Sequence, residues 1–361
     1  MWHAERCVKK LQYRSTTMTV AESDNNAFRV VDDRPHSLER QLAKGSAVPL
    51  SAPSMHGGHI TFTPVLATNE QQVLVNYMNA RPDKLGTSYN VGGNTRFGPH
   101  NYIEVVSAYA IKYEETHPVY QKFVQRRAQL RDADCDFETK NELTIFEGFI
   151  SKATKAMHSY IQHEMEPFGH TNINEQLLVH GTHIARSMRI IDNGFHMTRE
   201  DTMNPETTNK TNSLSEFTVG NYFTDELSKA DAFTKPFYDD HGNKIYACLI
   251  CRVLLGCPVI TNAQQFKLGE DIFGNTHLQN FYEKLGSDLT GETQKYTRPT
   301  EETVRVKNSL VILGGEGDTD GIDEFVTWND DQQLPFAIVF YKRMISPERS
   351  GGGEGGIRGR H

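Results

Sequence analysis

The chain has 361 residues, 37% of them hydrophobic, which is enough to bury one substantial core. Its 38 lysines and arginines are outnumbered by 46 aspartates and glutamates, so the formal net charge is -8. Proteins whose main partner is nucleic acid present a basic surface, and this composition argues against that class.

The sequence also bears on the cellular compartment. The first 14 residues mix charged and apolar side chains, unlike a secretory signal, and no later apolar run is long enough to cross a membrane. Five cysteines, an odd number, fit a reducing compartment better than a disulfide framework. We therefore expect an intracellular protein, of the nucleus or cytoplasm, that does not associate with membranes.

Both ends of the chain differ in composition from the middle. Residues 1–60 are polar and irregular and finish in KGSAVPLSAPSMHGG, which predicts a flexible N-terminal arm. Residues 346–361 end in GGGEGGIRGRH and predict a disordered, Gly-rich tail, since such a segment has almost nothing to bury. Residues 61–345 are interpreted as one folded domain.

The folded part opens with a helix signal. Thr68 followed by Gln71 resembles a capping box, and the segment NEQQVLVNYMNA then places Val73 and Tyr77 on one helical side. Next, YIEVVSAYAIKY is β-rich, and HPVYQKFVQRRAQL places Pro118 at a first helical position. The predicted order is helix, strand, helix.

A second capping signal, Thr139 with Glu142, introduces a long amphipathic segment. Its apolar residues alternate at spacings of three and four and so share one helical face: Leu143, Phe146, Ile150, Ala153, Met157 and Tyr160. This pattern predicts a helical insertion over about residues 138–165, whose apolar face is core or a partner surface.

Strands dominate the second half of the chain. Five segments are strand-like: 176–180, 244–255, 309–313, 323–329 and 335–342. Helical patterns lie mainly before them, so the order predicts an α+β fold rather than alternating, doubly wound units.

Three cysteines, Cys248, Cys251 and Cys257, lie in or beside the second of these segments. The surrounding IYACLICRVLLG is apolar and β-branched, and no second pair of cysteines or histidines follows at a zinc-binding spacing. We therefore expect buried strand thiols and no metal site.

The apolar run LLV ends in His180, Gly181 and Thr182. An imidazole can donate or accept a hydrogen bond, and a glycine lets another group approach the backbone closely, so this strand end favours a polar ligand. A histidine that is simply satisfied at a turn is the alternative.

Four motifs in one order carry a family resemblance: HGT at 180–182, GNYF followed by SK at 220–229, CRVLLG at 251–256, and EFV at 324–326. Together they resemble the catalytic domain of the poly(ADP-ribose) polymerase (PARP) family of ADP-ribosyltransferases. The similarity covers roughly residues 69–343.

The resemblance implies an ADP-ribosyltransferase-like fold, in which two antiparallel β-sheets form an NAD cleft and helices lie mainly N-terminal to the core. It implies NAD as co-substrate and a protein as acceptor, the enzyme itself included. The N-terminal region does not resemble the regulatory domains of DNA-dependent members, so activation by DNA breaks is not expected.

The resemblance also assigns roles to residues of this chain. His180 is expected to hydrogen-bond the adenosine ribose, and the backbone of Gly181 to pair with the nicotinamide carboxamide, with Thr182 completing the motif. Tyr222 is expected to stack on the nicotinamide ring, with Phe233 on its other face. Glu324 would bind the 2'-hydroxyl of the nicotinamide ribose and, with the histidine and Tyr222, form a catalytic His-Tyr-Glu triad.

Physical chemistry supports these residue types. Cleaving the bond to nicotinamide leaves positive charge on the ribose, which a carboxylate such as Glu324 stabilises. Two aromatic faces fix the leaving ring and exclude water. Judged alone, Tyr222 and Phe233 could equally be core residues. Glu324 is the last residue of the acidic run GEGDTDGIDE, which also fits a solvated loop or, less well, a calcium-binding turn.

Two positions depart from the family pattern. Ala230 stands where the family often has a serine that hydrogen-bonds the nicotinamide amide, and Phe233 stands where a tyrosine is usual. The carboxamide is therefore expected to lose one contact at Ala230.

Three functions stay open. The leading one is an active transferase; the glutamate favours polymer formation, although the loop before it also affects acceptor choice, so mono- and poly-transfer both remain. The second is a catalytically inactive relative that serves as an interaction module, and the third is an unrelated α+β domain.

Overall fold

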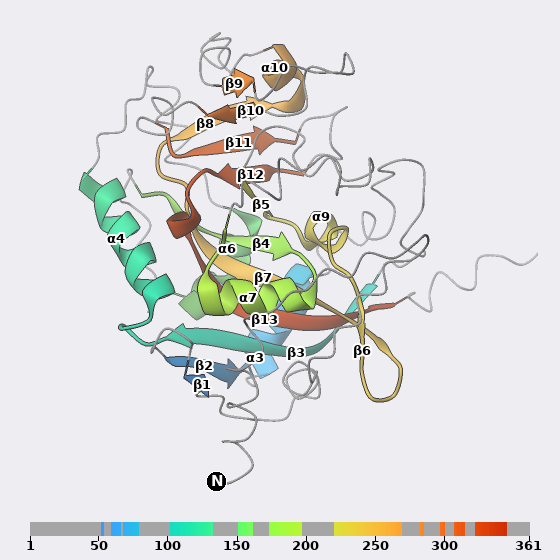
Figure 1. Cartoon of the computed structure of the whole chain (residues 1–361). Helices are drawn as coiled ribbons and strands as arrows, with labels where there is room; N and C mark the ends of the chain where they lie inside the picture. Colours follow the sequence, from blue (N-terminus) through green and yellow to red (C-terminus); the bar gives the residue numbers. More distant parts are fainter. Residues whose placement is uncertain are drawn as a thin grey trace, which may run out of the picture.

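The structure is a computed structural model in which a large β-sheet carries helices on both faces (Figure 1). It describes residues 52–53, 59–65, 68–78, 102–132, 151–161, 173–196, 220–268, 282–284, 297–299, 307–314 and 322–344. Most of the predicted arm, both ends of the predicted insertion, residues 197–219 and the tail lie outside these residues.

Within the described residues the main sheet has 11 strands, and the long strand near the C-terminus lies inside it. Its spatial order is β1 (Ala52–Pro53), β2 (His59–Pro64), β3 (Tyr102–Tyr113), β13 (Gln333–Met344), β7 (Lys244–Leu254), β4 (Glu175–Gly181), β5 (Asn221–Thr224), β12 (Glu324–Thr327), β11 (Ser309–Leu313) and β8 (Pro258–Asn262). β6 (Phe237–Tyr238) pairs with β7, while β9 (Tyr282–Lys284) and β10 (Thr297–Pro299) form a separate pair. All five strands expected in the second half are present at the expected places.

The sheet narrows to one residue pair between β4 and β5. Val179 and Thr224 are the register pair there, whereas β4 pairs with β7 along its whole length, from Glu175 to Gly181. The two expected antiparallel sheets are therefore two halves of one connected sheet in the described residues. One half also contains a parallel pair, β8 with β11. Alternation of apolar residues identifies strands but not which edges meet.

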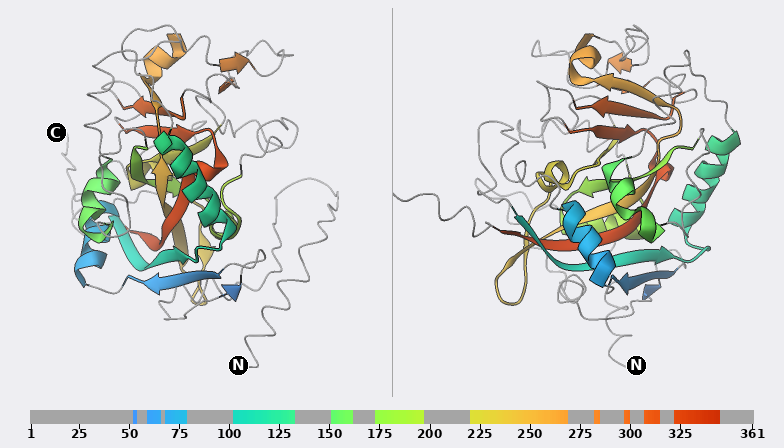
Figure 2. Two further views of the ribbon diagram at one scale, coloured as in Figure 1. Left: turned by 90° about the vertical axis from the view of Figure 1, so that its left-hand side faces the viewer. Right: turned by 180° about the vertical axis from the view of Figure 1, so that it is seen from behind.

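Helices cover both faces of the sheet (Figure 2). α4 (Pro118–Asp132) and α7 (Ile184–Asn193) lie on one face, and α3 (Thr68–Met78) and α6 (Lys152–Ile161) on the other. α9 (Leu227–Asp231) follows β5, α10 (Ala263–Leu268) follows β8, and a single 3-10 turn, η2 (Asp330–Gln332), precedes β13. Among the described residues the helices are spread along the chain rather than gathered before the core.

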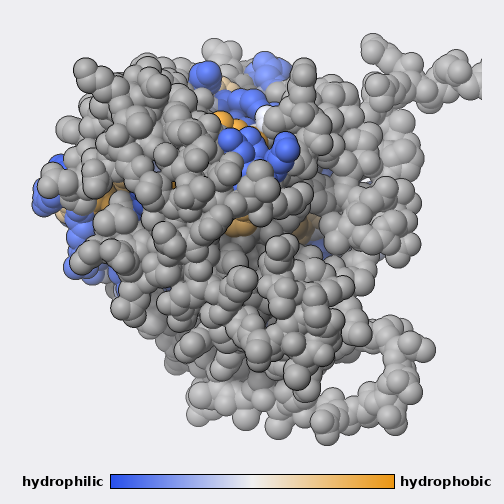
Figure 3. All heavy atoms as spheres, turned by 90° about the horizontal axis from the view of Figure 1, so that it is seen from above, coloured by the Kyte–Doolittle hydropathy of each residue, from blue (hydrophilic) through white to orange (hydrophobic). Residues whose placement is uncertain are grey.

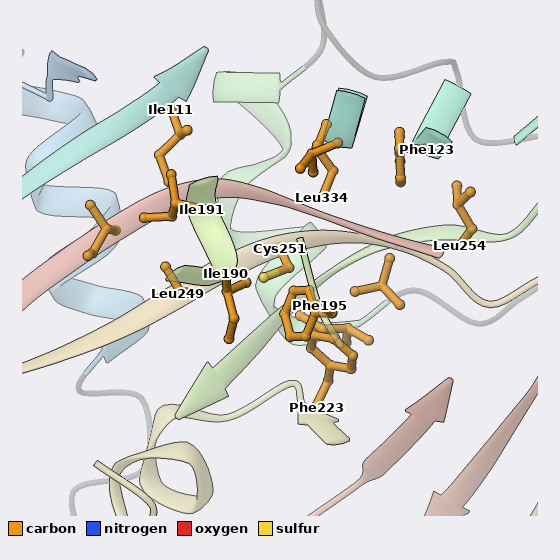
Figure 4. Packing of buried hydrophobic residues seen from close by; sticks show 14 of the residues in the cluster. Ile111, Phe123, Ile190, Ile191, Phe195, Phe223, Leu249, Cys251, Leu254 and Leu334 are labelled. Carbon is orange, nitrogen blue, oxygen red and sulfur yellow. The ribbon is translucent and has the colours of Figure 1, made fainter. Parts of the chain in front are cut away.

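The core on the α4 and α7 face is a continuous hydrophobic cluster. Phe123 of α4 and Ile190 and Ile191 of α7 pack against alternate residues of the central strands, such as Leu249 and Cys251 of β7 (Figure 4). The rings of Phe195 and Phe223 lie against each other in this cluster, with centroids 5.4 Å apart.

A second cluster fills the opposite face. Cys248 and Ile250 of β7, which alternate with the residues of the first cluster, pack there with Leu74 of α3 and Met157 of α6. β7 is therefore buried on both faces, which explains why its sequence is apolar at every position except Lys244 and Arg252.

The cysteines lie where the strand interpretation puts them. Cys248 and Cys251 are buried in β7, and Cys257 is buried in the turn just after it. Burial raises the pKa of Cys248 and of Cys251 well above the usual thiol range, so both are protonated, unreactive thiols at neutral pH.

Local signals account for several helix ends. α4 begins at Pro118, as predicted, where the missing N–H removes no intrahelical bond. α7 begins after His183, whose ring accepts a hydrogen bond from the Ala185 N–H at 3.1 Å, and ends at Gly194 with φ 83°. The positive φ explains the glycine there.

The predicted insertion is described only in its second part, as α6. Ala153 and Met157 are buried in the core, so in this part the apolar stripe is core. Its earlier members, Leu143, Phe146 and Ile150, lie outside the described residues, as does the capping signal.

A short strand pair lies at the N-terminal edge of the main sheet. Ala52 pairs with Ile60 and Pro53 with His59, which places strand pairing inside the region expected to be a flexible arm. Pro53 sits on an edge strand, a position in which a proline is tolerated within a sheet.

No helix of the described residues is long and apolar enough to span a bilayer. At the end of the sheet that carries β8 and α10, the described surface residues are mainly hydrophilic, with hydrophobic ones in recesses between them (Figure 3).

Candidate active site

The end of β4 brings the HGT motif to the seam of the sheet, which is the place where β4 and β5 share a single residue pair. Leu177, Leu178 and Val179 are fully buried, whereas His180 and Gly181 are only partly buried. The apolar run holds the strand in place, and the chain leaves it at Thr182, which is 7% exposed, to start α7.

Next to the last β4–β5 pair, the side chain of His180 connects β4 to the backbone of β5. Its Nδ1 lies 2.9 Å from the backbone oxygen of Tyr222, and its ring centroid lies 5.1 Å from that of Phe195 and 5.5 Å from that of Phe223. A carbonyl oxygen only accepts hydrogen bonds, so Nδ1 carries the proton. This satisfies a carbonyl at the point where β4 and β5 stop pairing.

The protonation state of His180 follows from its surroundings. Burial lowers its pKa to about 4, against the opposing effect of the bond to Tyr222, and the positive charge of Arg186 acts in the same direction as burial. The ring is therefore neutral at pH 7, and with Nδ1 protonated its Nε2 is a hydrogen-bond acceptor.

Gly181, Ala230 and Phe233 meet at one carbonyl group. A Cβ built on Gly181 would lie 1.8 Å from the backbone oxygen of Ala230, so the strand and α9 approach each other too closely for any side chain. The same oxygen accepts a hydrogen bond from the Phe233 N–H at 3.0 Å. This contact sets the position of α9 relative to the end of β4.

Tyr222 and Glu324 lie on the same face of neighbouring strands. In the β5–β12 register Glu324 is opposite Thr224 and Val326 is opposite Tyr222, and residues opposite each other share a face. Val179 is opposite Thr224, so this is the face covered by the α3, α6 and α9 side of the core. The ring of His180 lies on the other face, against Phe223.

The carboxylate of Glu324 is buried and paired. Lys229 Nζ, on α9, lies 2.8 Å from Glu324 Oε1, and the two residues are 3% and 6% exposed. Lys229 belongs to the Ser-Lys dipeptide of the second family motif, from which no role for it was predicted. The sequence does not show that this lysine is buried, and a buried lysine is almost always paired with an acid, so its role becomes evident only in the structure.

α9 is held at its C-terminal end by a buried polar network. Asp231 Oδ1 accepts hydrogen bonds from Tyr341 Oη at 2.6 Å and from Arg343 Nε at 3.0 Å, both from β13. Arg343 Nη2 also donates to the Asp231 backbone oxygen at 2.7 Å. The guanidinium lies over the ring of Tyr246, 3.8 Å from its centroid. The network fixes the segment that carries Lys229 and Ala230.

The simpler alternatives can be judged residue by residue. Phe233 is 50% exposed, so it is not a core residue, and Tyr222 is partly buried at the edge of a small cluster around Val326. Glu324 is a buried strand residue and not part of a solvated loop. Among the described residues, no group of three histidine, cysteine, aspartate or glutamate side chains is arranged to hold a metal ion.

The structure thus gathers most of the expected site residues. Gly181, Ala230 and Phe233 meet at one carbonyl, and Tyr222 and Glu324 share a face beside Lys229. His180 also contacts β5, but its ring bonds to the backbone oxygen of Tyr222 and not to the Tyr222 side chain. Together, the two faces of the sheet at this place offer a neutral acceptor, a glycine backbone, two rings and one carboxylate.

Comparison with known proteins identifies the family. A family model described as the poly(ADP-ribose) polymerase catalytic domain matches residues 94–335, which is well over half of the chain. No curated protein matches the chain. The matched region contains α4, β4, α7, β5, α9, β7 and β12, and so every candidate site residue named above. The chain therefore belongs to the PARP catalytic domain family.

Proposed function

We propose that this protein transfers ADP-ribose from NAD to a protein acceptor and releases nicotinamide. One observation carries the proposal: the buried carboxylate of Glu324 is paired with Lys229 on the face that also holds Tyr222, next to the seam where Gly181 meets Ala230. The acceptor is an intracellular protein, the enzyme itself included.

NAD would lie at the seam between β4 and β5. Strand pairing between them stops at Val179, so the backbone of Gly181 on that side is not engaged by β5 and suits the nicotinamide carboxamide. The neutral ring of His180 offers Nε2 to a hydroxyl of the adenosine ribose. The ring of Tyr222 is half-buried and that of Phe233 exposed, which suits stacking on the two faces of nicotinamide.

The chemistry is the breaking of one bond and the making of another. The bond between ribose C1' and the nicotinamide nitrogen breaks, its electrons leave with nicotinamide, and positive charge develops on the sugar. An acceptor oxygen then bonds to C1' and loses its proton. The carboxylate of Glu324, at the ribose 2'-hydroxyl, stabilises this charge as it develops, and Lys229 holds the carboxylate in place.

A second candidate function, an inactive interaction module, has one observation in its favour. Ala230 offers no hydroxyl to the carboxamide and is itself 2% exposed, packed against Gly181. The loss of one contact weakens NAD binding, but the retained carboxylate favours the active enzyme. Mono- and poly-transfer both fit this site.

Incubation with NAD labelled in the adenylate tests the proposal. The wild type, Glu324→Gln and a control, Glu115→Gln, are compared for label transferred to protein and for nicotinamide released. Glu115 is an exposed glutamate in the turn between β3 and α4. We expect wild type and control to react, and Glu324→Gln to be slower by about 10²–10³-fold.

Two outcomes contradict the proposal. If neither the wild type nor Glu324→Gln releases nicotinamide or transfers label, the result supports the inactive interaction module instead. If Glu324→Gln reacts as fast as the wild type while remaining folded, the carboxylate is not at the reacting sugar.

A further inference from the structure

The first turn of α6 lies on the turn that joins β5 to α9. The backbone N–H of Lys152 donates to Asp225 Oδ2 at 3.3 Å, and its ammonium lies 3.7 Å from Asp225 Oδ1. The same ammonium forms an ion pair with Glu226 Oε1. Both acids, Asp225 and Glu226, are nearly fully buried, at 2% and 3% exposed, and the start of a helix favours such negative charge.

α6 is itself fixed to β4 just before the HGT motif. Ser151 Oγ donates to the Leu177 backbone oxygen at 2.7 Å, and the Leu177 N–H donates to Thr154 Oγ1 at 2.8 Å. The Ser151 N–H also donates to Gln176 Oε1 at 3.0 Å. Three short side chains thus attach the helix to the strand that ends in His180, so α6 is a firm support for Lys152.

The turn also connects directly to the proposed catalytic pair. Asp225 and Glu226 come immediately before α9, which carries Lys229. The Glu226 N–H donates to Thr224 Oγ1, and that hydroxyl donates to the Asp323 backbone oxygen at 3.1 Å, next to Glu324. A shift of this turn would therefore move Lys229 and the start of β12 together.

Acidic groups crowd this turn. Burial raises the pKa of Asp225 to about 6, against the opposing charge of Lys152, and the charges of Asp323 and Glu226 raise it further. Burial also raises the pKa of Asp323. From α3, Tyr77 donates its hydroxyl to the Asp225 backbone oxygen at 2.8 Å, and burial raises the pKa of that hydroxyl well above its usual range. Lys152 is the cation that opposes this negative charge from α6.

We propose that Lys152 is a positioning residue, which holds the Asp225–Glu226 turn against α6 and so keeps Lys229 on Glu324, and that protonation of Asp225 releases this hold. The inference rests on the proposed transferase function and gives the inserted helix a role in it. Protonation of Asp225, which lies outside the proposed NAD site, then makes the reaction sensitive to mild acid.

The direction of the pH effect follows from the charges. In the wild type Asp225 is half protonated near pH 6, and the hold becomes complete as the pH rises above this value. Without the Lys152 charge, Asp225 takes up its proton at a higher pH, because an opposite charge close by lowers the pKa of a carboxylate by about one unit or more. The acid limb of the activity profile therefore moves to higher pH.

The test measures nicotinamide release from NAD between pH 5 and 9 for four proteins. These are wild type, Lys152→Met, Lys152→Arg as the charge-retaining variant, and Lys155→Met as the control. Lys155 is an exposed lysine on the same helix. Lys152→Met keeps the backbone N–H that binds ionised Asp225 but loses the ammonium. We therefore expect it to be less active than the other three at pH 8 and to lose the remaining activity about one pH unit earlier on acidification. In Asp225→Asn, which cannot ionise, this limb should disappear.

The proposal is overturned if the acid limb of Lys152→Met coincides with that of the wild type, or if Lys155→Met shifts equally. Thermal unfolding separates this failure from a failure of the transferase function. If the wild type turns over no NAD, the hold of Lys152 on the Asp225–Glu226 turn is tested by the Tm difference between wild type and Lys152→Met. That difference should be larger at pH 8 than at pH 5, and equal differences at both pH values would contradict it.

Discussion

The backbone oxygen of Ala230 occupies the space that a side chain on Gly181 would need, 1.8 Å from an ideal Cβ position. We therefore expect Gly181→Ala to push β4 and α9 apart. The variant should lose about 3 kcal/mol of unfolding free energy, since overpacking a tight backbone contact costs this much. Its KM for NAD should rise as well, which steady-state nicotinamide release measures.

A matched glycine serves as the control for this variant. Gly242 has a φ of +78° but no heavy atom within 4 Å of an added Cβ, so Gly242→Asn should be tolerated, because asparagine adopts this conformation readily. If Gly181→Ala unfolds like the wild type in urea, the close approach is not rigid.

The ion pair between Lys229 and Glu324 makes a second prediction. Lys229→Met leaves a buried carboxylate without a partner, which should destabilise the fold by about 3 kcal/mol. The double variant Lys229→Met/Glu324→Gln should recover part of this loss, because no unpaired charge remains buried. Urea unfolding of both singles and the double gives the coupling energy. Strict additivity of the two single changes would contradict the pairing.

His180 makes a pH-dependent contribution to stability. The folded protein takes up the proton near pH 4, whereas the unfolded chain does so near pH 6.5. Between these values the unfolded chain binds more protons, so the contribution is complete above pH 6.5 and is lost as the pH falls toward 4.

Comparison with His180→Asn, which keeps an N–H donor but does not titrate, isolates this effect. From pH 7.5 to pH 5 the wild type should lose about 1 to 2 kcal/mol more unfolding free energy than the variant, a range that allows for the partial exposure of the ring. Identical losses in the two proteins would mean that the ring titrates normally in the fold.

The network around Asp231 should affect both stability and substrate affinity. Asp231→Asn weakens the bonds from Tyr341 and Arg343, and we expect a loss of about 2 kcal/mol, as for other hydrogen bonds to charged groups. Because the network holds α9, the KM for NAD should rise more than kcat falls.

The neighbouring surface offers a control for Asp231→Asn. Lys342, next to Arg343, pairs with Glu104 across 3.9 Å, with side chains 31% and 47% exposed. Lys342→Gln should change stability by less than about 0.5 kcal/mol. If Asp231→Asn and Lys342→Gln change the unfolding free energy equally, the burial of Asp231 does not strengthen its interactions.

Elements with strong local signals could be predicted from the sequence. The strand expected from YIEVVSAYAIKY is β3, with the same limits, and α4 begins at the predicted proline. β4, β7 and β13 were predictable because their residues are apolar enough to be buried on both faces. These signals depend on the chain within a few residues, which is what a sequence displays.

Relationships between distant segments could not be predicted in this way. The periodicity of β4 and β5 gives no information that they share a single pair, and nothing near Lys152 indicates that it meets Asp225, 73 residues later. The order of motifs identified the family and hence Glu324, but not the lysine that is paired with it. Long-range register and charge pairing depend on the whole fold.

The single pair between Val179 and Thr224 also affects how the molecule opens. The strands β3, β13, β7 and β4 pair along long stretches, while β5, β12, β11 and β8 form a smaller block on the other side. Because only one backbone pair joins the two blocks, they should open independently of each other. Their amides should therefore exchange with solvent deuterium as two separate cooperative groups. A ligand that touches both blocks would merge them and slow exchange in the smaller one.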